Sequence, residues 1–346
     1  MNSPSKTTHI FLHNFRCTGN SLNLALRNYF MHDHVKYGQV NDKTFTYDEV
    51  VTLARKRQPK FILGHNSFGL HRQFDFPCRY FVNFRDPVER LVSGFVTWTK
   101  VGGQNIEEYY RDHLERSNGM TYRLLGFGKR DQQLYDFNLD QPIESLPEID
   151  DTLFQQAIDN LSEFADVILV SEMFSESIVN MEETLQLPDL VCPQGIFYNQ
   201  SKTFISAKHF PSTILEELRD ANQWDYKLYD HAKQRLQSML AERDDAFWEK
   251  VRIRKLMTDM MKEPHLDVVD GTMIVNKLQN GLNALLGLGR YDDVVPVVSL
   301  FINSVTVDIK AAQNIVQALR GTVKPDGIKT LQGVLEGKIR EFKLAS

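Results

Sequence analysis

The sequence predicts an α/β fold, with a parallel β-sheet flanked by helices, followed by an all-α C-terminal appendage. Two observations predict the α/β part. Short apolar runs rich in β-prone residues recur up to about residue 240, and several lead through a polar turn into an amphipathic helix. A third observation separates the C-terminal part, because this alternation ends near residue 250. We therefore expect two domains, residues 1–248 and residues 249–346.

Composition and charge narrow the class of protein. The 346 residues are 42% apolar and 25% charged, which is typical of a globular protein with two modest domains. The net charge of −5 argues against binding of a polyanion over the whole surface, so we expect no nucleic-acid partner. Residues 250–346 carry 14 Lys and Arg against 10 Asp and Glu, a net of +4, which leaves −9 for the rest. An anionic ligand of the first domain therefore needs a local pocket.

The cysteines and the N-terminal segment suggest a compartment. Cys17, Cys78 and Cys192 are odd in number and have unrelated spacings, so they predict neither a disulfide framework nor a metal site. A reducing compartment fits this usage best. The opening segment, MNSPSKTTHIF, has no apolar stretch long enough for a signal peptide or a membrane anchor. We expect no transmembrane segment and a cytoplasmic location.

Residues 9–31 form the stretch around which the rest is organised, and they read as strand, turn and helix. Residues 9–13 are a β-prone apolar run, and residues 17–21 are a turn of small polar residues. The apolar residues that follow recur at helical spacing; they are Leu22, Leu24, Ala25, Leu26 and Tyr29.

This turn is a candidate anion site. The first N–H groups of a helix have no partner within the helix, and the helix dipole adds partial positive charge there. Arg16 adds a permanent cation beside the turn, and side-chain donors come from Thr18, Asn20 and Ser21. We interpret the turn as a cradle for a phosphate or phosphosulfate group. An ordinary βα turn with a helix cap is the alternative.

A second candidate anion site follows the strand predicted at residues 79–84. Arg85 stands at the carboxyl end of that strand, and Asp86 and Pro87 suit the N-cap and first positions of a helix. Glu89 completes a capping-box-like pair with Asp86. Ser93 lies eight residues after Arg85, on the same helix, so both side chains can reach one phosphate. The alternative makes Arg85 a structural ion-pair partner of Asp86 or Glu89.

A third candidate lies after the short strand predicted at residues 61–63. This strand leads directly into the loop at residues 64–71, which contains His65 and His71. Residues just past the carboxyl ends of strands line the ligand crevice of open α/β sheets. Either histidine is therefore a candidate general base, and the alternative is that each is a surface or capping residue.

The remaining elements are assigned by periodicity. Residues 99–150 lack strong periodicity and read as a substrate-facing insertion or a mobile loop. A polar loop at residues 199–203 contains Lys202 and Thr203. The other expected elements are helices at residues 50–58, 152–164, 171–187, 212–221 and 225–241, and a strand at residues 167–170. The short amphipathic helices after residue 250 suit self-association or packing better than catalysis.

Several of these segments resemble those of one enzyme family. The run from Arg85 to Ser93, RDPVERLVS, resembles the 3′-phosphate-binding motif of sulfotransferases that use 3′-phosphoadenosine-5′-phosphosulfate (PAPS). It is most similar to the carbohydrate branch that includes heparan sulfate 2-O-sulfotransferase. FLHNFRCTGNSL resembles the 5′-phosphosulfate loop of that family, usually FLHIPKTGGTSL. GHNSFGLH resembles its catalytic-base segment, and VILVSEMFSESIVNMEETL its later strand and helix. The similarity spans about residues 9–240.

This resemblance implies a P-loop-like sheet, the sulfotransferase fold, and a set of roles. PAPS would be the sulfuryl donor, and the acceptor would be a hydroxyl on a glycan or a small molecule; no metal is required. His65 would be the general base, and Arg85 and Ser93 would bind the 3′-phosphate. Lys202 and Thr203 would close over the cofactor. The 5′-phosphosulfate loop would be Arg16, Cys17, Thr18, Gly19, Asn20, Ser21 and Leu22.

The chain departs from the family pattern in its loop. Arg16 stands where the family usually has Lys, and Phe15 replaces a customary Pro. Arginine keeps the charge, but it cannot give up a proton to the leaving phosphate. An electrostatic role for Arg16 is therefore expected in place of proton donation.

Two other functions compete with this prediction. A P-loop kinase or NTPase needs Gly-Lys-Ser/Thr at the end of its loop, and the chain has Gly19, Asn20 and Ser21 there, without the lysine. A binding or scaffold protein that keeps the fold without turnover is the second alternative, because the loop is altered. Nucleotide binding without sulfuryl transfer would identify it.

Overall fold

A computed structural model describes most of the chain, and the protein forms two compact units. The described residues are 7–19, 22, 23, 26, 33–36, 38–40, 43–102, 117–130, 133–187, 190, 207, 210–261, 271–304 and 309–345. The first unit contains Met1–Gly19, Phe30–Ser177 and Thr203–Ala241. The second contains Asn20–Tyr29, Ile178–Lys202 and Glu242–Ser346.

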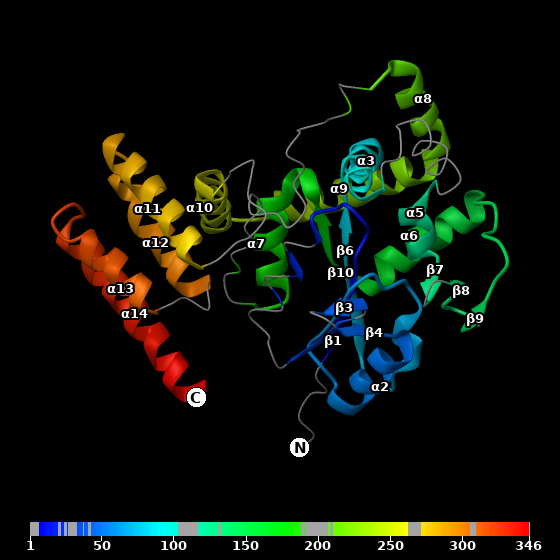
Figure 1. Ribbon diagram of the computed structural model, residues 1–346, viewed down its shortest axis with the longest axis horizontal. Coiled ribbons are helices and arrows are strands. Elements are labelled where there is room, and N and C mark those ends of the chain that lie inside the picture. The colour runs from blue at the N-terminus through cyan, green and yellow to red at the C-terminus, as the bar shows by residue number, and fades with distance from the viewer. Residues whose placement is uncertain are drawn as a thin grey trace. The chain divides into compact units, whose positions relative to one another are not determined.

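A five-stranded parallel sheet forms the centre of the first unit (Figure 1). Its order is β10-β6-β1-β5-β2. The strands are β1 (Thr8–Leu12), β2 (His34–Lys36), β5 (Phe61–Leu63), β6 (Cys78–Phe84) and β10 (Ala165–Val170). The parallel sheet and four of its strands are thus confirmed. β2 was not predicted, because its three residues, HVK, hold a single apolar side chain.

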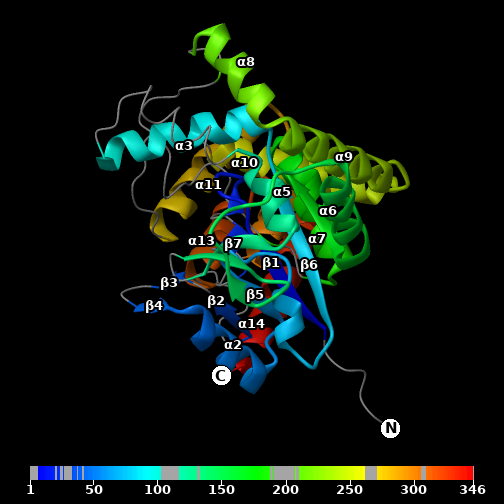
Figure 2. The ribbon, with the colours of Figure 1, turned by 90° about the vertical axis from the view of Figure 1, so that its right-hand side faces the viewer.

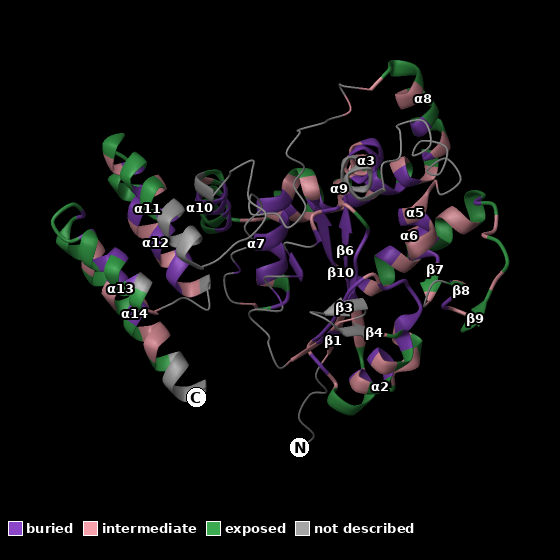
Figure 3. Ribbon diagram, in the orientation of Figure 1, coloured by how far each residue is buried: buried purple, intermediate pink, exposed green. Residues whose placement is uncertain are grey.

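The central strands are apolar because both faces of the sheet are covered. β1 pairs in parallel with β6 from Thr8↔Cys78 to Leu12↔Val82, and Ile10, Phe11 and Leu12 are fully buried. Figure 3 shows the strands in the colour of buried residues. The strands of a parallel sheet covered on both faces have continuous apolar sequences, and the predicted strands have this pattern.

Helices flank the sheet, as predicted. The helices that lie wholly in the first unit are α2 (Tyr47–Arg57), α3 (Pro87–Gly102), α5 (Gly119–Leu124), α6 (Asp151–Phe164), α8 (Ser212–Ala221) and α9 (Gln223–Ala241), and α7 (Phe174–Thr184) begins in the first unit and continues into the second. α6 and α9 pack against β10. α3 begins at Pro87, and Figure 2 shows it leaving the tip of β6. The described part of the chain thus confirms the α/β class.

The segment at residues 99–150 is more ordered than its sequence suggests. Its described part holds α5 and an antiparallel sheet of β7 (Phe127–Arg130), β8 (Gln133–Asp136) and β9 (Gln141–Pro142). A further antiparallel pair comprises β3 (Gly38–Val40) and β4 (Lys43–Phe45). The sequence analysis did not predict these strands, since strands of two to four residues are too short for a periodicity to register.

The second unit is helical after residue 241, as expected. Its helices there are α10 (Asp245–Met261), α11 (Gly271–Gly287), α12 (Tyr291–Ser304), α13 (Ile309–Ala318) and α14 (Pro325–Ala345). They share an apolar core that includes Leu278, Val298, Phe301 and Leu331. The expected boundary at residue 248 falls inside α10. No helix among the described residues is both long and apolar enough to cross a bilayer.

Candidate functional site

The strand order creates a switch point between β1 and β6. After β1 the chain crosses to the side of β5 and β2, and after β6 it crosses to β10 on the other side. Ligands of open α/β sheets bind in the crevice at the carboxyl ends of strands that part in this way. The loop that contains Arg16 follows β1, and Arg85 follows β6, so two of the predicted residues flank the switch point.

The loop after β1 is held in shape by a pair of buried asparagines. Asn83 on β6 accepts a hydrogen bond at Oδ1 from the main-chain N–H of Asn14, at 2.7 Å. Its Nδ2 donates to the main-chain oxygen of Cys17 at 2.6 Å, and Asn14 Nδ2 donates back to the oxygen of Asn83 at 2.8 Å. These bonds satisfy loop polar groups that would otherwise be buried without partners, and they tie the loop to β6.

Arg16, Arg85 and Ser93 are brought together by main-chain contacts. The Arg16 guanidinium donates to the main-chain oxygen of Ser93 at 3.0 Å, and the Arg85 guanidinium donates to the main-chain oxygen of Arg16 at 3.2 Å. Arg16 and Thr18 both have left-handed backbone conformations, with φ of 63° and 59°. The predicted 5′ loop and the predicted 3′-phosphate residues are therefore neighbours at one edge of the sheet.

Gly19 is required by a close approach of His13. A Cβ at position 19 would lie 2.0 Å from Nε2 of His13, so no other residue fits there without displacing the ring. His13 is itself 3% exposed and lies beneath the loop. The glycine thus serves packing under the loop.

A serine that the sequence analysis missed joins the loop from β10. Ser171 Oγ donates to the main-chain oxygen of Phe84 at 3.0 Å and lies 3.3 Å from the hydroxyl of Thr18. Thr18 also donates to the main-chain oxygen of Cys17 at 2.6 Å. Its position just past the carboxyl end of a buried strand is the signal that could have identified Ser171.

His65 lies just past β5, held on both ring faces. Its imidazole stacks on His13 with ring centroids 4.3 Å apart and on Phe15 at 3.9 Å. Nδ1 lies 3.1 Å from the main-chain oxygen of His13. A carbonyl oxygen only accepts, so this bond requires a proton on Nδ1 and leaves the lone pair of the neutral ring on Nε2.

The surroundings of His65 keep it neutral. Burial, followed by the charge of Arg123, lowers the pKa of His65 to about 3, although its bond to His13 acts in the opposite direction. The ring is therefore in its basic form at neutral pH, with Nε2 as the proton acceptor. The orientation suits a general base, and the low pKa of His65 weakens it in the protein without ligand.

Arg123 on α5 is a second residue that the sequence analysis missed. Its Nη1 donates to the main-chain oxygens of His13 and Asn66, both at 3.2 Å. Its Cζ lies 4.8 Å from the ring centroid of Phe15. Arg123 therefore contributes a cation beside His65, and no periodicity or motif in its segment marks it.

His71, the rival base, lies elsewhere. Its Nδ1 is 2.9 Å from the hydroxyl of Tyr80, and its main-chain N–H donates to the same hydroxyl at 3.1 Å. Burial, with Arg72 as a smaller cause, lowers the pKa of His71 to about 4. Tyr80 precedes Phe84 by four residues on β6, about 13 Å along a strand, so His71 is remote from Arg85.

The start of α3 combines the predicted cap with a long-range partner. Asp86 accepts from the N–H of Glu89 at 2.9 Å, as expected for a cap. The N–H of Asp86 donates instead to Glu172, at 3.0 Å, so the reciprocal half of the capping box is replaced. Arg85 lies 3.9 Å from Glu89, an ion-pair distance longer than a hydrogen bond.

The other predicted residues differ in what the structure says of them. Asn20, Ser21, Lys202 and Thr203 lie outside the described residues. Leu22 is buried and helical, within the segment that belongs to the second unit. The thiol of Cys17 is fully buried, and burial raises its pKa to about 12. Cys17 therefore serves the packing of the loop, and its main-chain oxygen accepts hydrogen bonds from Asn83 and Thr18.

The donors at this edge suit an anionic ligand. The cations Arg16 and Arg85 lie near the switch point, beside a helical residue, Gly19. The hydroxyls of Thr18 and Ser171 already donate to main-chain oxygens, so they would have to turn from those partners to donate to an anion. A scan against models of known protein families finds no match, and a search of curated proteins finds no similar sequence. Chemistry must therefore be argued from these side chains and from the motifs.

Proposed function

We propose that this chain is a PAPS-dependent sulfotransferase, built on a P-loop-like sulfotransferase fold, that acts on an acceptor hydroxyl of a carbohydrate. The observation that carries the proposal is the meeting of Arg16, Arg85 and Ser93 at the switch point, with His65 past the next strand end. The resemblance of the RDPVERLVS and FLHNFRCTGNSL segments to the family supports the same assignment.

Binding of the nucleotide uses the two predicted anion sites. Arg85 and Ser93 would hold the 3′-phosphate, and Arg16, Thr18 and the main chain of the loop would hold the 5′-phosphosulfate. Lys202 and Thr203 would close over it. The proposal is supported by the positions of Arg16 and Arg85, which follow neighbouring strands and lie within one hydrogen bond of each other, as the binding of one ligand with two phosphate groups would need.

PAPS supplies an activated sulfuryl group for in-line displacement at sulfur. His65 Nε2 takes the proton of the acceptor hydroxyl while the acceptor oxygen forms its bond to sulfur. The bond from sulfur to the bridging oxygen breaks, and its electron pair leaves with adenosine 3′,5′-bisphosphate. Arg16 and the loop donors stabilise the charge that builds on that oxygen. Arg16 supplies charge only, because arginine keeps its proton.

The low pKa of His65 has a direct consequence for this mechanism. A nearby opposite charge favours the protonated form of histidine. Anionic phosphate groups bound at the Arg16 loop are therefore expected to raise the pKa of His65 from about 3 and strengthen it as a base. The base would be activated by the donor that it serves.

A binding protein without turnover is the second candidate function. The observation that favours it is the engagement of Arg16 with the main-chain oxygen of Ser93, which ties the cation to the protein. Such a protein would bind the bisphosphate and transfer nothing. The P-loop kinase remains the weaker alternative, because the loop lacks the lysine.

Two measurements test these functions. Calorimetry should give tighter binding of adenosine 3′,5′-bisphosphate than of 5′-AMP or ATP, since a charge-assisted contact to the 3′-phosphate contributes about 1.5–3 kcal/mol, or roughly ten- to a hundred-fold. Equal affinities for the bisphosphate and 5′-AMP would sink the assignment. Labelled PAPS, offered with glycans and small alcohols and read by mass, then separates enzyme from binding protein.

A further inference from the structure

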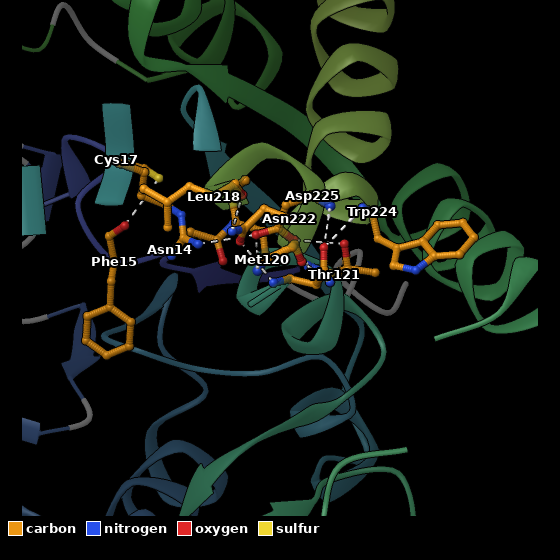
Figure 4. A network of polar contacts seen from close by, with 12 residues as sticks. Asn14, Phe15, Cys17, Met120, Thr121, Leu218, Asn222, Trp224 and Asp225 are labelled. Carbon is orange, nitrogen blue, oxygen red and sulfur yellow. Dashed lines mark hydrogen bonds and ion pairs between the residues drawn. The ribbon is translucent and has the colours of Figure 1, made fainter. Parts of the chain in front are cut away.

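Three helices of the first unit meet at one buried carboxylate, that of Asp225 in the first turn of α9 (Figure 4). Its Oδ1 accepts from the N–H of Thr121 at 2.8 Å and from the Thr121 hydroxyl at 2.9 Å. Its Oδ2 accepts from the N–H of Met120 at 3.1 Å and from Arg90 Nη2 at 3.3 Å. Asp225 is 0% exposed, and these donors occupy about all the lone pairs of a carboxylate.

The contact between α5 and α9 is reciprocal. Asp225 binds the N–H groups of Met120 and Thr121, in the first turn of α5. Asn118, just before α5, binds the N–H groups of Trp224 and Asp225 at 3.0 Å and 3.1 Å. Each helix therefore caps the other, and neither can shift along its axis without breaking these bonds.

The two other helices at this carboxylate both carry groups of the candidate site. α5 continues from Thr121 to Arg123, whose guanidinium lies beside His65. α3 continues from Arg90 by three residues to Ser93, whose main-chain oxygen holds Arg16. Residues three apart lie within one turn of a helix, so the contact of Arg90 with Asp225 is close to that carbonyl. One side chain thus fixes both the base region and the 3′-phosphate region.

Electrostatics make the carboxylate hard to replace. The N-terminal ends of α5 and α9 both bring partial positive charge to it, and Arg90 adds a full charge with a side chain only 11% exposed. Without the carboxylate these three positive groups would face one another away from water. α3 and α5 are expected to move apart in response.

We propose that Asp225 is a positioning residue of the candidate site, holding α3 and α5 where Ser93 meets Arg16 and Arg123 meets the carbonyl that binds His65. The meaning of the site rests on the function proposed above, whereas the positioning itself is a claim about the two helices. Asp225 touches no reacting atom; it acts through Arg90 and Thr121.

The test separates the two arms of this network. Asp225→Asn breaks the Oδ2 arm and weakens the other, Arg90→Met removes only the α3 contact, and Thr121→Val removes only the hydroxyl contact from α5. Asp230→Asn, an exposed carboxylate on α9, is the matched control. Calorimetry with adenosine 3′,5′-bisphosphate reports on the α3 arm. The ¹⁵N imidazole signals of His65 at pH 7, assigned with His65→Gln, report on the α5 arm through the Nδ1–H tautomer.

The expected results differ between variants. Asp225→Asn weakens bisphosphate binding by about 2- to 30-fold, the range for a coupling network, and lowers the Nδ1–H population of His65. Arg90→Met weakens binding with little change in the tautomer, and Thr121→Val does the reverse. Asp230→Asn changes neither. If Asp225 contributed to stability alone, Asp225→Asn would lower the free energy of unfolding and leave both the bisphosphate affinity and the His65 tautomer of the folded protein unchanged.

Each failure has a separate meaning. If Asp225→Asn does not fold, the two single-arm variants decide the question. If Arg90→Met and Thr121→Val both fold, and their bisphosphate affinity and His65 tautomer match those of the unsubstituted protein, Asp225 does not position the site. If the unsubstituted protein fails to prefer the bisphosphate over 5′-AMP, the proposed function is wrong, and the tautomer of His65 still tests the α5 arm.

Discussion

The amino ends and the carboxyl ends of the parallel strands form two edges of the sheet, and similar side chains have different partners at each. At the amino edge, Arg79 on β6 pairs with the carboxylate of Asp166 on β10 at 2.6 Å, and His71 is bound to Tyr80. At the carboxyl edge, Arg16 and Arg85 donate to main-chain oxygens, which are neutral, and the ion pair of Arg85 with Glu89 is long, at 3.9 Å. A close carboxylate partner offsets the charge of an arginine, whereas a carbonyl or a more distant carboxylate leaves more of that charge to act on a ligand. Anion binding is therefore expected at the carboxyl edge.

The largest expected effect contrasts the two histidines of one loop. His65→Ala should lower kcat by about 10²- to 10⁴-fold with nearly unchanged bisphosphate affinity, the usual contribution of a positioned base. His71→Ala should leave kcat within a few-fold, because that ring is bound to Tyr80 far from Arg85. Steady-state kinetics on the acceptor found in the transfer screen give both values. Near-normal turnover of His65→Ala would make His65 structural.

The next effect contrasts Arg85, which follows β6, with Arg79, which lies near the start of that strand. Arg85→Ala should weaken bisphosphate binding by roughly ten- to a hundred-fold, since the 3′-phosphate contact is lost. Binding of 5′-AMP should weaken much less, because the variant removes a single hydrogen bond to the loop, that to the main-chain oxygen of Arg16. Arg79→Ala is the control, and it removes a partly exposed ion pair that contributes at most about 1 kcal/mol to stability. Calorimetry measures the affinities. Equal losses for both nucleotides would show that Arg85 acts on the loop and not on the 3′-phosphate.

Stability should also depend on how the loop is tied to β6. Asn83→Ala removes the donors and acceptor that bind Asn14 and Cys17, so the free energy of unfolding should fall by about 1–3 kcal/mol. Urea denaturation measures this loss. Bisphosphate affinity should fall with it, and an unchanged affinity in a destabilised Asn83→Ala protein would separate the loop from the ligand site.

The smallest effect of a single residue concerns pH and the share of His71 in it. The pKa of His71 is lowered to about 4 and that of His65 to about 3, so between those values and pH 6.5 the unfolded chain binds more protons than the folded protein. Stability is therefore retained above pH 6.5 and lost as pH falls, by at most about 1.4 kcal/mol per unit for each buried histidine and less where solvent screens the charge. Denaturation at pH 7, 6 and 5 should show this slope. Burial also lowers the pKa values of His9 and His13, so these residues contribute to the same slope. His71→Gln should reduce the slope, and an unchanged slope would contradict the lowered pKa of His71.

Local signals in the sequence were enough for four of the five strands of the parallel sheet and for the start of α3. The buried strands, Pro87 at the first turn of α3 and the cap at Asp86 all follow from residues close together in the chain. The partner of the Asp86 N–H, Glu172, lies 86 residues away and could not be read from its neighbours. Ser171 differs, because its position just past the end of β10 was a local signal, and only its partners, Thr18 and Phe84, are distant in the sequence.

Arg123 and Asp225 show a second reason for what was missed. Arg123 lies in a six-residue helix, too short to give a periodic signal. From the sequence, Asp225 is an ordinary acidic residue in the first turn of its own helix, where its negative charge would interact favourably with the dipole of α9. In the folded chain it caps α5 instead. Only the crossing of two helices distinguishes these roles.

The contact between Gly19 and His13 makes two positions of the chain interdependent. Any side chain at position 19 would occupy the volume of the imidazole, 2.0 Å from Nε2. A substitution there should be tolerated only together with a smaller residue at position 13, so the double variant Gly19→Ala with His13→Ala should fold better than Gly19→Ala alone. In a library of variants, the two sites should therefore show strong sign epistasis, with the order of mutation deciding which paths are open.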